Sequence, residues 1–377
     1  MQELERKPKG SRREQERARR RRNRRIRRIV ICVVEVLMLV IVLGCCYVIS
    51  KWDKIQHDEI DQDDIKVNSS MDASQVEVMQ TGYRTIALLG TDSRSGKLER
   101  GVNNDVIIIC TINNATGEVK LASVYRDTWM HMPDLGYYSK ANDAMCQVGT
   151  SLASVNMLNE NLDLTIDEYV TVNWAAVATA INLMGGLEDV TVPEEIIEGL
   201  RGYITSVVEE TGIPSIQLEP GDGSPRHLDG VQAVALCRYR YQGLNDTGRT
   251  ANQRMIIGKM LEKAKTLSLG QLISIADQVF PMVATTYSLN EVLDMAKLIS
   301  KLYIGETVGF PMNAKGYTVP DQYKAYPSQG TDCLMPVDLA GDVKTLHGFL
   351  YNQTDYQPSP TVQRLSEAIK ADVGFNQ

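Results

Sequence analysis

The chain has 377 residues, of which 43% are hydrophobic and 23% charged, and its formal net charge is -7. This composition excludes an intrinsically disordered protein and allows one large or two ordinary domains. The charge is uneven, because residues 1–28 hold fourteen Lys/Arg and four Glu, net +10, which leaves -17 for the other 349 residues. An acidic body argues against general nucleic-acid binding, which needs distributed positive charge.

The N-terminus predicts a membrane anchor. The basic segment, residues 1–28, is followed by an apolar run, residues 29–49, that contains a single charge, Glu35, and is long enough to cross a bilayer as a helix. Basic residues before the run predict a cytoplasmic N-terminus and an extracytoplasmic body, as in a single-pass cell-membrane protein. A cleavable signal peptide is disfavoured because no small-residue cleavage site follows. The stretch Val42–Cys45 loosely resembles a lipoprotein cleavage box, which would also leave the body anchored outside.

The globular part is predicted to begin after a polar, acid-rich linker, residues 50–80. An apolar run of strand type, Tyr83–Gly90, comes first. A second strand is expected over Val106–Ile112, and the turn that follows it leads into a third, Glu118–Val124. These last two strands predict a hairpin.

Carboxylates and a cation stand at the ends of these strands. Asp92 follows the first strand, Asp105 precedes the second, and Arg126 and Asp127 follow the third. Two carboxylates are what Mg²⁺ normally takes from a protein while substrate phosphates complete its shell. The alternative is that both aspartates only cap turns.

The middle of the chain is apolar and predicts helix and strand core. We expect a helix over Leu152–Leu162, a strand over Tyr169–Val172, and a second helix over Trp174–Met184 that ends at a glycine pair. The acidic stretch Glu194–Asp222 is expected to be an irregular insertion.

A concentration of cations at residues 236–254 predicts a phosphate site. Alternation over Leu236–Tyr241 is typical of a strand that points Arg238 and Arg240 to one face. A helical pattern follows, with Asp246 or Thr247 as its N-cap, and Arg249 and Gln253 are four residues apart on one helix face. A helix N-terminus with cations suits an anion. A solvated strand edge with surface ion pairs is the alternative.

The remainder, residues 266–377, is predicted to be a helical extension that packs on the preceding domain. Helices are expected over Leu269–Val279, Leu289–Leu302 and Val337–Leu350, with the last 25 residues polar and loose. Cys110, Cys146, Cys237 and Cys333 have no metal-ligand spacing, and either disulfides or buried free thiols are open to them.

In order along the chain, several motifs resemble those of the LytR-CpsA-Psr family over residues 83 to about 265. They are Leu88–Arg94, Asn104-Asp105, Tyr125–Thr128, Lys140-x-Asn142, Gly185–Leu187, Leu228–Gly230, Arg238-x-Arg240, Asp246-x-Gly248-Arg249 and Gln253. The resemblance implies an extracytoplasmic α/β domain, residues 81–265, with a central mixed sheet flanked by helices, after one transmembrane helix.

The resemblance also implies a function. Members move a glycopolymer, of the teichoic acid or capsular polysaccharide type, from an undecaprenyl-pyrophosphate carrier to peptidoglycan. By position, Asp92 and Asp105 would hold Mg²⁺ and act with Arg126 in catalysis. The pyrophosphate ligands would be Arg94, Arg126, Lys140, Arg238, Arg240, Arg249 and Gln253. Some of the apolar residues between Leu152 and Gly186 would line a tunnel for the polyprenyl tail.

Three departures from the family pattern concern the same site. Tyr125 stands where the family has Pro, and Asn103 and Asn252 stand where it has Arg. Arg100 or Arg254 is the candidate to replace a missing phosphate contact. Two other functions share these residues: a polyprenyl-pyrophosphate hydrolase with water as acceptor, and a non-catalytic envelope receptor that needs the lipid pocket but not the carboxylate pair.

Overall fold

The computed structural model describes residues 56–57, 61–93, 101–240, 246–318 and 332–373, all within one unit, Ile55–Gln377. The predicted basic segment and membrane span, residues 1–28 and 29–49, lie outside the described residues, as do Arg94 and Arg100. Within the described ranges, no helix has both the length and the apolar character to cross a membrane.

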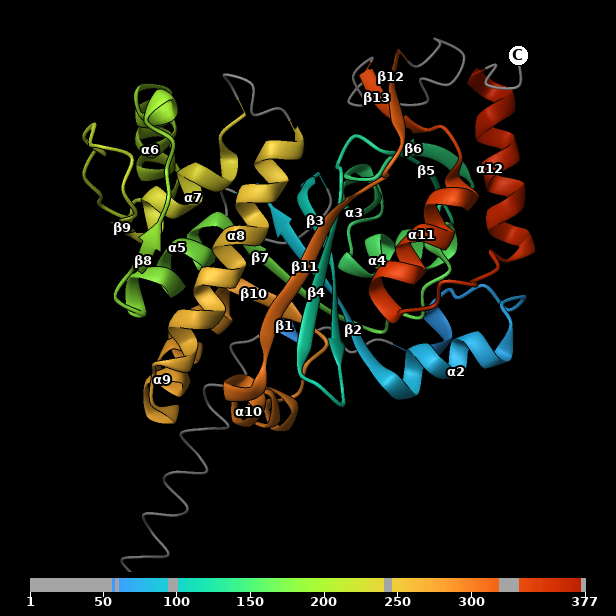
Figure 1. The fold of residues 1–377 in the computed structure, drawn as a ribbon, viewed down its shortest axis with the longest axis horizontal. Helices are drawn as coiled ribbons and strands as arrows, with labels where there is room; N and C mark the ends of the chain where they lie inside the picture. The colour runs from blue at the N-terminus through green and yellow to red at the C-terminus, as the bar shows by residue number, and fades with distance from the viewer. Residues whose placement is uncertain (1–55, 58–60, 94–100, 241–245, 319–331, 374–377) are drawn as a thin grey trace, which may run out of the picture. The chain divides into compact units, whose positions relative to one another are not determined.

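A seven-stranded mixed sheet organises the unit (Figure 1). Its strand order is β1-β10-β7-β2-β3-β4-β11. Strand β2 pairs parallel with β7 and antiparallel with β3, and β3 pairs antiparallel with β4. In chain order, the strands of this sheet are β1 (Gln56–His57), β2 (Tyr83–Thr91), β3 (Asn104–Asn113), β4 (Glu118–Val124), β7 (Glu168–Asn173), β10 (Val283–Thr285) and β11 (Tyr303–Phe310).

Three small two-stranded sheets accompany the central one. They are β5 (Trp129–Met132) with β6 (Tyr137–Lys140), β8 (Leu187–Val190) with β9 (Arg226–Leu228), and β12 (Ala314–Thr318) with β13 (Asp332–Pro336). Short 3-10 helices occur at η1 (Gln62–Asp64), η2 (Glu194–Ile196), η3 (Phe280–Met282) and η4 (Ile299–Lys301).

Helices cover both faces of the sheet, which explains why its central strands are apolar on both sides. On one face, Ala87 and Leu89 of β2 pack with α4, α11 and α12; on the other, Ile86 packs with residues of α8 and α10. The helices are α2 (Ala73–Gly82), α3 (Asp143–Val148), α4 (Ser151–Leu162), α5 (Trp174–Leu183), α6 (Ile197–Thr211), α7 (Gly230–Arg238), α8 (Asp246–Lys265), α9 (Leu269–Val279), α10 (Leu289–Leu298), α11 (Leu339–Tyr351) and α12 (Pro360–Val373).

Most predicted elements are confirmed. The three early strands correspond to β2, β3 and β4, and the predicted hairpin is the β3–β4 pair, whose turn closes when Gly117 N–H donates to the Asn113 carbonyl at 2.9 Å. The two middle helices and the strand between them correspond to α4, α5 and β7. The helix predicted over Leu269–Val279 is α9.

The strand predicted over Leu236–Tyr241 is wrong. Residues 230–238 form helix α7, which begins with a capping box in which Asp229 accepts from Gln232 N–H and Gln232 reaches back to Asp229 N–H. The helix is buried all round, so its sequence shows no polar face at helical spacing, and the Arg-Tyr-Arg alternation at its C-terminal end imitates a strand.

Two other regions are more regular than predicted. The expected irregular insertion contains α6, which buries one stripe, Ile197, Leu200, Ile204 and Val207. The expected loose C-terminus contains α12, which buries Val362, Leu365 and Ile369 in the core.

The flanking segments also take part in the fold. Within residues 50–80, expected to be a linker, β1 pairs with β10 and Met79 of α2 is buried in the core. Residues 266–377, expected to be helical, supply β10 and β11 to the central sheet.

The contact between α5 and α7 leaves no room for a side chain at Gly230. A Cβ there would lie 2.0 Å from the Ala178 carbonyl oxygen, whereas a Cβ at Gly202, exposed on α6, would meet nothing within 4 Å. We predict that Gly230→Ala lowers the free energy of unfolding by about 2 kcal/mol or more through overpacking. Gly202→Ala should raise it by roughly 0.5–1 kcal/mol. Chemical denaturation of both variants checks this, and equal effects would contradict the packing described.

Candidate functional site

The candidate site lies at one edge of the central sheet. Buried Thr91, the last residue of β2, pairs with Asn104 at the start of β3 and with Asn173 at the end of β7. Asp92 therefore follows Thr91 beside the β3 residue Asp105. Because β4 runs antiparallel to β3, the residues after β4 return to the same edge. Ligands of open α/β sheets commonly bind at the carboxyl ends of such strands.

An ion pair connects two of the predicted residues. Arg126 Nη1 donates to Asp105 Oδ1 at 2.8 Å, and both side chains are about four-fifths buried. Asp127 lies 3.4 Å from Arg126 Nε through Oδ2 and 3.4 Å from Lys140 Nζ through Oδ1. Asp127 thus contacts two cations of the predicted set, Arg126 and Lys140, and can orient Arg126.

Helix α8 brings the late residues to this edge. Arg249 and Gln253 are both buried on one side of the helix, which confirms their predicted common face. Arg249 Nη2 lies 2.9 Å from Asp246 Oδ1, and Gln253 Nε2 donates to the Cys237 carbonyl at 3.0 Å. The spacing of three between Asp246 and Arg249 is the sequence signal for this ion pair, beside the N-cap position predicted for Asp246.

Electrostatics links the two groups. Burial would lower the pKa of Arg126, but Asp105 and Asp127 outweigh it and raise that pKa. Burial is the main cause that lowers the pKa of Arg249, and the nearby positive charges of Arg126 and Arg240 act in the same direction. The described cations of this edge, Arg126, Lys140, Arg240 and Arg249, are thus matched in number by Asp92, Asp105, Asp127 and Asp246, so an added anion would be balanced together with an added cation.

The predicted pair Arg238 and Arg240 behaves differently from expectation. Arg238, the last residue of α7, makes two bonds to Glu210 of α6, at 2.7 and 3.1 Å, and lies over the Trp174 ring at 5.8 Å. Arg240 is exposed. The strand prediction had placed both arginines on one free face, and it missed Glu210 because residues 194–222 were expected to be irregular.

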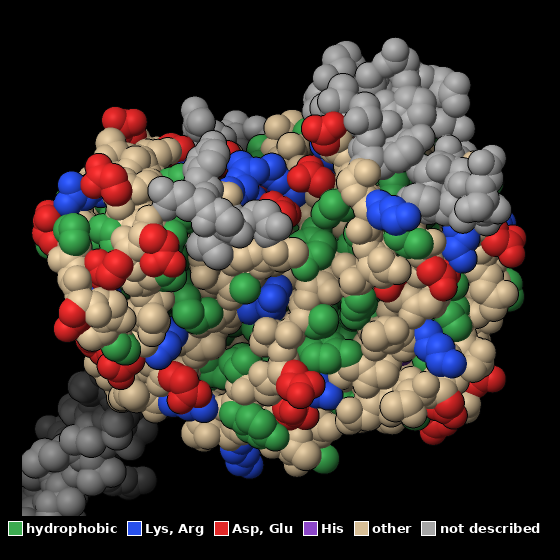
Figure 2. Space-filling model, turned by 45° about the horizontal axis from the view of Figure 1, so that its top comes forward, with side chains coloured by type: hydrophobic (Ala, Val, Ile, Leu, Met, Phe, Trp, Pro, Cys, Tyr) green, Lys and Arg blue, Asp and Glu red, His purple; other side chains and the backbone are tan. Residues whose placement is uncertain are grey.

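Several buried polar atoms at this edge have no hydrogen-bond partner among the described residues. They are Asp92 Oδ1, Arg126 Nε, Arg249 Nε and Gln253 Oε1. Since buried polar groups are normally satisfied, their concentration among the predicted residues is consistent with a polar ligand. In Figure 2, which brings the upper end of Figure 1 forward, Lys and Arg side chains gather beside Asp and Glu side chains.

One of the family departures, Asn252, and the candidate replacement Arg254 have contacts of their own. Asn252 donates to the Leu236 carbonyl at 3.4 Å. Arg254 is buried and donates to Ser123 Oγ at 2.7 Å, between α8 and β4. Arg254 is thus bound beneath the edge, and its Nε has no partner in the described part of the chain.

An apolar cavity of about 400 Å³ adjoins the charged residues. Gln253, which lies one helical turn after Arg249, is part of its wall. Gly90, two residues before Asp92, is another part. The rest of the lining is almost entirely aliphatic or aromatic and comes from the sheet and from α5, α8 and α9: Leu88, Val106, Ile108, Val170, Val172, Trp174, Val177, Ile256, Ile257, Met260, Leu272, Ile275, Val279 and Phe280 are among its members. Residues between Leu152 and Gly186 were candidates for a tunnel wall. Of the two helices in that range, α5 lines the cavity and α4 does not.

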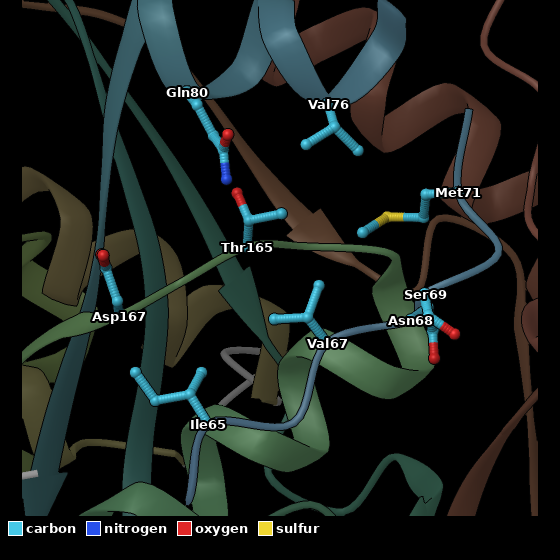
Figure 3. A pocket seen from close by; sticks show the side chains of 9 residues that line it. All are labelled: Ile65, Val67, Asn68, Ser69, Met71, Val76, Gln80, Thr165 and Asp167. Atoms are coloured by element: carbon cyan, nitrogen blue, oxygen red, sulfur yellow. The ribbon is translucent and has the colours of Figure 1, made fainter. Parts of the chain in front are cut away.

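A second cavity, of about 380 Å³, lies between residues 65–71, α2 and the segment before β7 (Figure 3). Gln80 and Thr165 point toward each other across it. None of the predicted site residues lines this cavity.

The carboxylates present fit a hard divalent cation of the Mg²⁺ type. Asp92 offers a buried oxygen without a described partner, and Asp105 lies at the adjacent strand start. Among the described residues, no group of three or more His, Cys, Asp or Glu side chains could hold a metal. Two carboxylates, with the remaining ligands from water and phosphate, are the usual protein share for Mg²⁺.

Comparison with known proteins decides the family. The LytR_cpsA_psr family model matches residues 44–325, which are 282 of the 377 residues. The chain belongs to the LytR_cpsA_psr family. Similar curated members include the polyisoprenyl-teichoic acid–peptidoglycan teichoic acid transferases TagU of Enterococcus faecalis, 29% identical over 52% of this chain and 58% of that protein, and TagV of Bacillus subtilis, 27% identical over 62% and 57%. The matched regions thus span little more than half of these relatives.

Solved structures of family members share the fold. The crystal structure of Bacillus subtilis TagV has a TM-score of 0.53 at 21% identity, covering 74% of this chain and all of that one. A structure described as TagT bound to LIIa-WTA has a TM-score of 0.51 at 20% identity, covering 78% and 91%. The mixed sheet flanked by helices is therefore the architecture of the family.

The different surroundings of the two arginines predict different effects of their loss. We predict that Arg249→Gln weakens Mg²⁺-pyrophosphate binding about tenfold or more, because a buried charged donor is removed. Arg238→Gln should change it by less than about threefold, since both Nη atoms of Arg238 already bond to Glu210, whereas Arg249 pairs with Asp246 through Nη2. Isothermal titration with inorganic pyrophosphate measures both, and a larger loss from Arg238→Gln would contradict the assignment.

Proposed function

We propose that this protein is a membrane-anchored phosphotransferase that moves a glycopolymer, of the teichoic acid or capsular polysaccharide type, from an undecaprenyl-pyrophosphate carrier to peptidoglycan. The family membership supports the class of reaction. The names of its relatives, teichoic acid transferases, support the polymer type.

The observation that supports a carrier lipid as donor is that an apolar cavity adjoins a charged cluster. Gln253 of α8 lies in the cavity wall. One turn earlier on the same helix, Arg249 pairs with Asp246 in the charged cluster. A polyprenyl pyrophosphate has the same division, with an apolar tail and a doubly charged head. Burial of the tail removes apolar surface from water, while the arginines satisfy the phosphate oxygens.

The chemistry follows from the donor. The acceptor hydroxyl of peptidoglycan attacks the phosphorus that carries the glycopolymer, a new P–O bond forms, and the bridging P–O bond of the pyrophosphate breaks. Polyprenyl phosphate leaves, and the hydroxyl proton passes to Asp92 or Asp105. Arg126 and Arg249 balance the negative charge that develops on the phosphoryl oxygens and on the leaving group.

The metal is part of this proposal. Asp92 and Asp105 would hold Mg²⁺, which when bound neutralises charge on the two phosphates. Asp105 would then hold the metal, and Arg126, which contacts Asp105 in this structure, would bind phosphate.

The predicted carboxylate pair provides the direct test. Asp92→Asn and Asp105→Asn should each lower glycopolymer transfer about 100-fold or more, because charge stabilisation at the phosphoryl group is lost. The matched control is Asp294→Asn, an exposed carboxylate on α10 that pairs with Lys297. Transfer is measured as polymer joined to muropeptide.

The product separates this proposal from a hydrolase. Polymer found only as free phosphorylated glycan, with none on muropeptide, would show water as the acceptor. Full transfer by both aspartate variants in cells without other family members would contradict a catalytic site at this edge.

The cavity has its own test. Val177→Trp on α5 places a bulky indole ring in the cavity wall and should raise KM for a long-chain donor about tenfold while changing that for a short-chain donor less. The control is Ala251→Trp, which adds the same indole ring at an exposed position of α8. Equal KM changes for both donor lengths would contradict tail binding in the cavity.

A further inference from the structure

Helix α9 has two apolar edges, and only one of them faces the protein. Leu272, Ile275, Ala276 and Val279 line the apolar cavity. Leu269 and Ile273, four residues apart on another edge, are 48% and 44% exposed. The helix contains one charged residue, Asp277, and none of its residues is fully buried. A wall of the cavity is thus a helix that also presents large apolar side chains outward.

The neighbouring helix carries a further exposed apolar residue. Leu298, at the end of α10, is 44% exposed, and α10 contacts α9. Figure 1 shows the two helices at the lower end of the sheet, while α8 runs from the upper edge, where the charged site lies, down to α9. Eight large apolar side chains of the described residues are exposed, and three of them lie on these two helices. Grouped exposed apolar residues mark a contact surface more often than single ones do.

The chain length limits how far this surface lies from a membrane. The apolar run predicted to span the bilayer ends at Ile49, and β1 begins seven residues later at Gln56, a reach of at most about 25 Å. Gln56 pairs with Ala284 of β10, and only η3 stands between α9 and β10. Helix α9 is therefore joined to a strand that the chain holds near the end of the predicted span.

Charge adds little to this surface. Lys263 and Lys265 end α8, and Lys297 ends α10, but Lys265 is paired with Glu262 and Lys297 with Asp294. Attraction to anionic lipid is therefore partly cancelled, and the apolar edge is the main source of affinity.

We propose that the outward edge of α9, Leu269 and Ile273 with Leu298 beside it, docks on the lipid bilayer, so that the carrier's tail passes from the acyl chains directly into the cavity lined by the other edge of the same helix. This rests on the proposed membrane anchor and carrier lipid. The bilayer, rather than a second protein, is the occupant because the edge shares its helix with the wall of an apolar cavity and is tied to the predicted span by a short chain.

Photocrosslinking of the full chain in vesicles tests the docking. A benzoylphenylalanine at position 273 should form an adduct with phosphatidylglycerol in mixed phosphatidylglycerol–phosphatidylcholine vesicles. The matched control replaces Ile216, which is 77% exposed in the segment between α6 and β9. The lipid adduct at 273 should exceed that at 216 about fivefold or more, as expected for a side chain held at the interface. Equal adducts, no lipid adduct at 273, or adducts only with a second copy or another protein would overturn the proposal.

A kinetic arm separates docking from the function itself. The double variant Leu269→Asp and Ile273→Asp should lower transfer from a long-chain donor embedded in vesicles about tenfold, through loss of apolar contact with lipid. Transfer from a short-chain, water-soluble donor should stay unchanged, as should both rates in Ile216→Asp. An equal loss with both donors would contradict a docking role. If the unmodified protein transfers from neither donor, the proposed function fails, while the lipid adduct at position 273 still decides the docking.

Discussion

The ion pair between Asp105 and Arg126 is the contact on which the site depends. Two charges that are about four-fifths buried are costly to desolvate unless they meet, and here they meet between the start of β3 and the end of β4. Their position is fixed by the antiparallel register that sets Ile108 opposite Ser123. In the proposed function, Arg126 would bind the anionic ligand and Asp105 would bind its cation. The pair therefore keeps both groups in place and balanced when no ligand is bound.

Helix α8 connects this charged edge with the apolar interior. Its first turns carry Asp246, Arg249 and Gln253, and its next turns carry Ile256, Ile257 and Met260 into the cavity wall. A helix rises by about 1.5 Å per residue, so the change from charge to hydrocarbon occurs over roughly 10 Å. One rigid element thus sets the distance between the charged edge and the apolar cavity, as a scaffold for a molecule with two unlike ends would need.

Local patterns predicted much of the fold and of the site. The apolar runs of β3 and β4 and the turn at Asn113–Gly117 specify the hairpin, and the helical spacing of Arg249 and Gln253 specifies their common face. The prediction failed at α7, because a helix buried on every side has no polar stripe to show its period. That failure carried over to Arg238, whose partner Glu210 lies 28 residues earlier on a helix that was itself expected to be irregular. A local stretch of sequence cannot predict a tertiary pair between residues so far apart in the chain.

We infer that one amphipathic pyrophosphate occupies both the charged edge and the apolar cavity. The decisive measurement is a crystal structure with a polyprenyl pyrophosphate and Mg²⁺. We expect phosphate density between Arg126 and Arg249, within reach of Asp92 and Asp105, and a tail that runs past Ile256 toward α9. Phosphates bound elsewhere, or a tail lying outside the cavity, would contradict it.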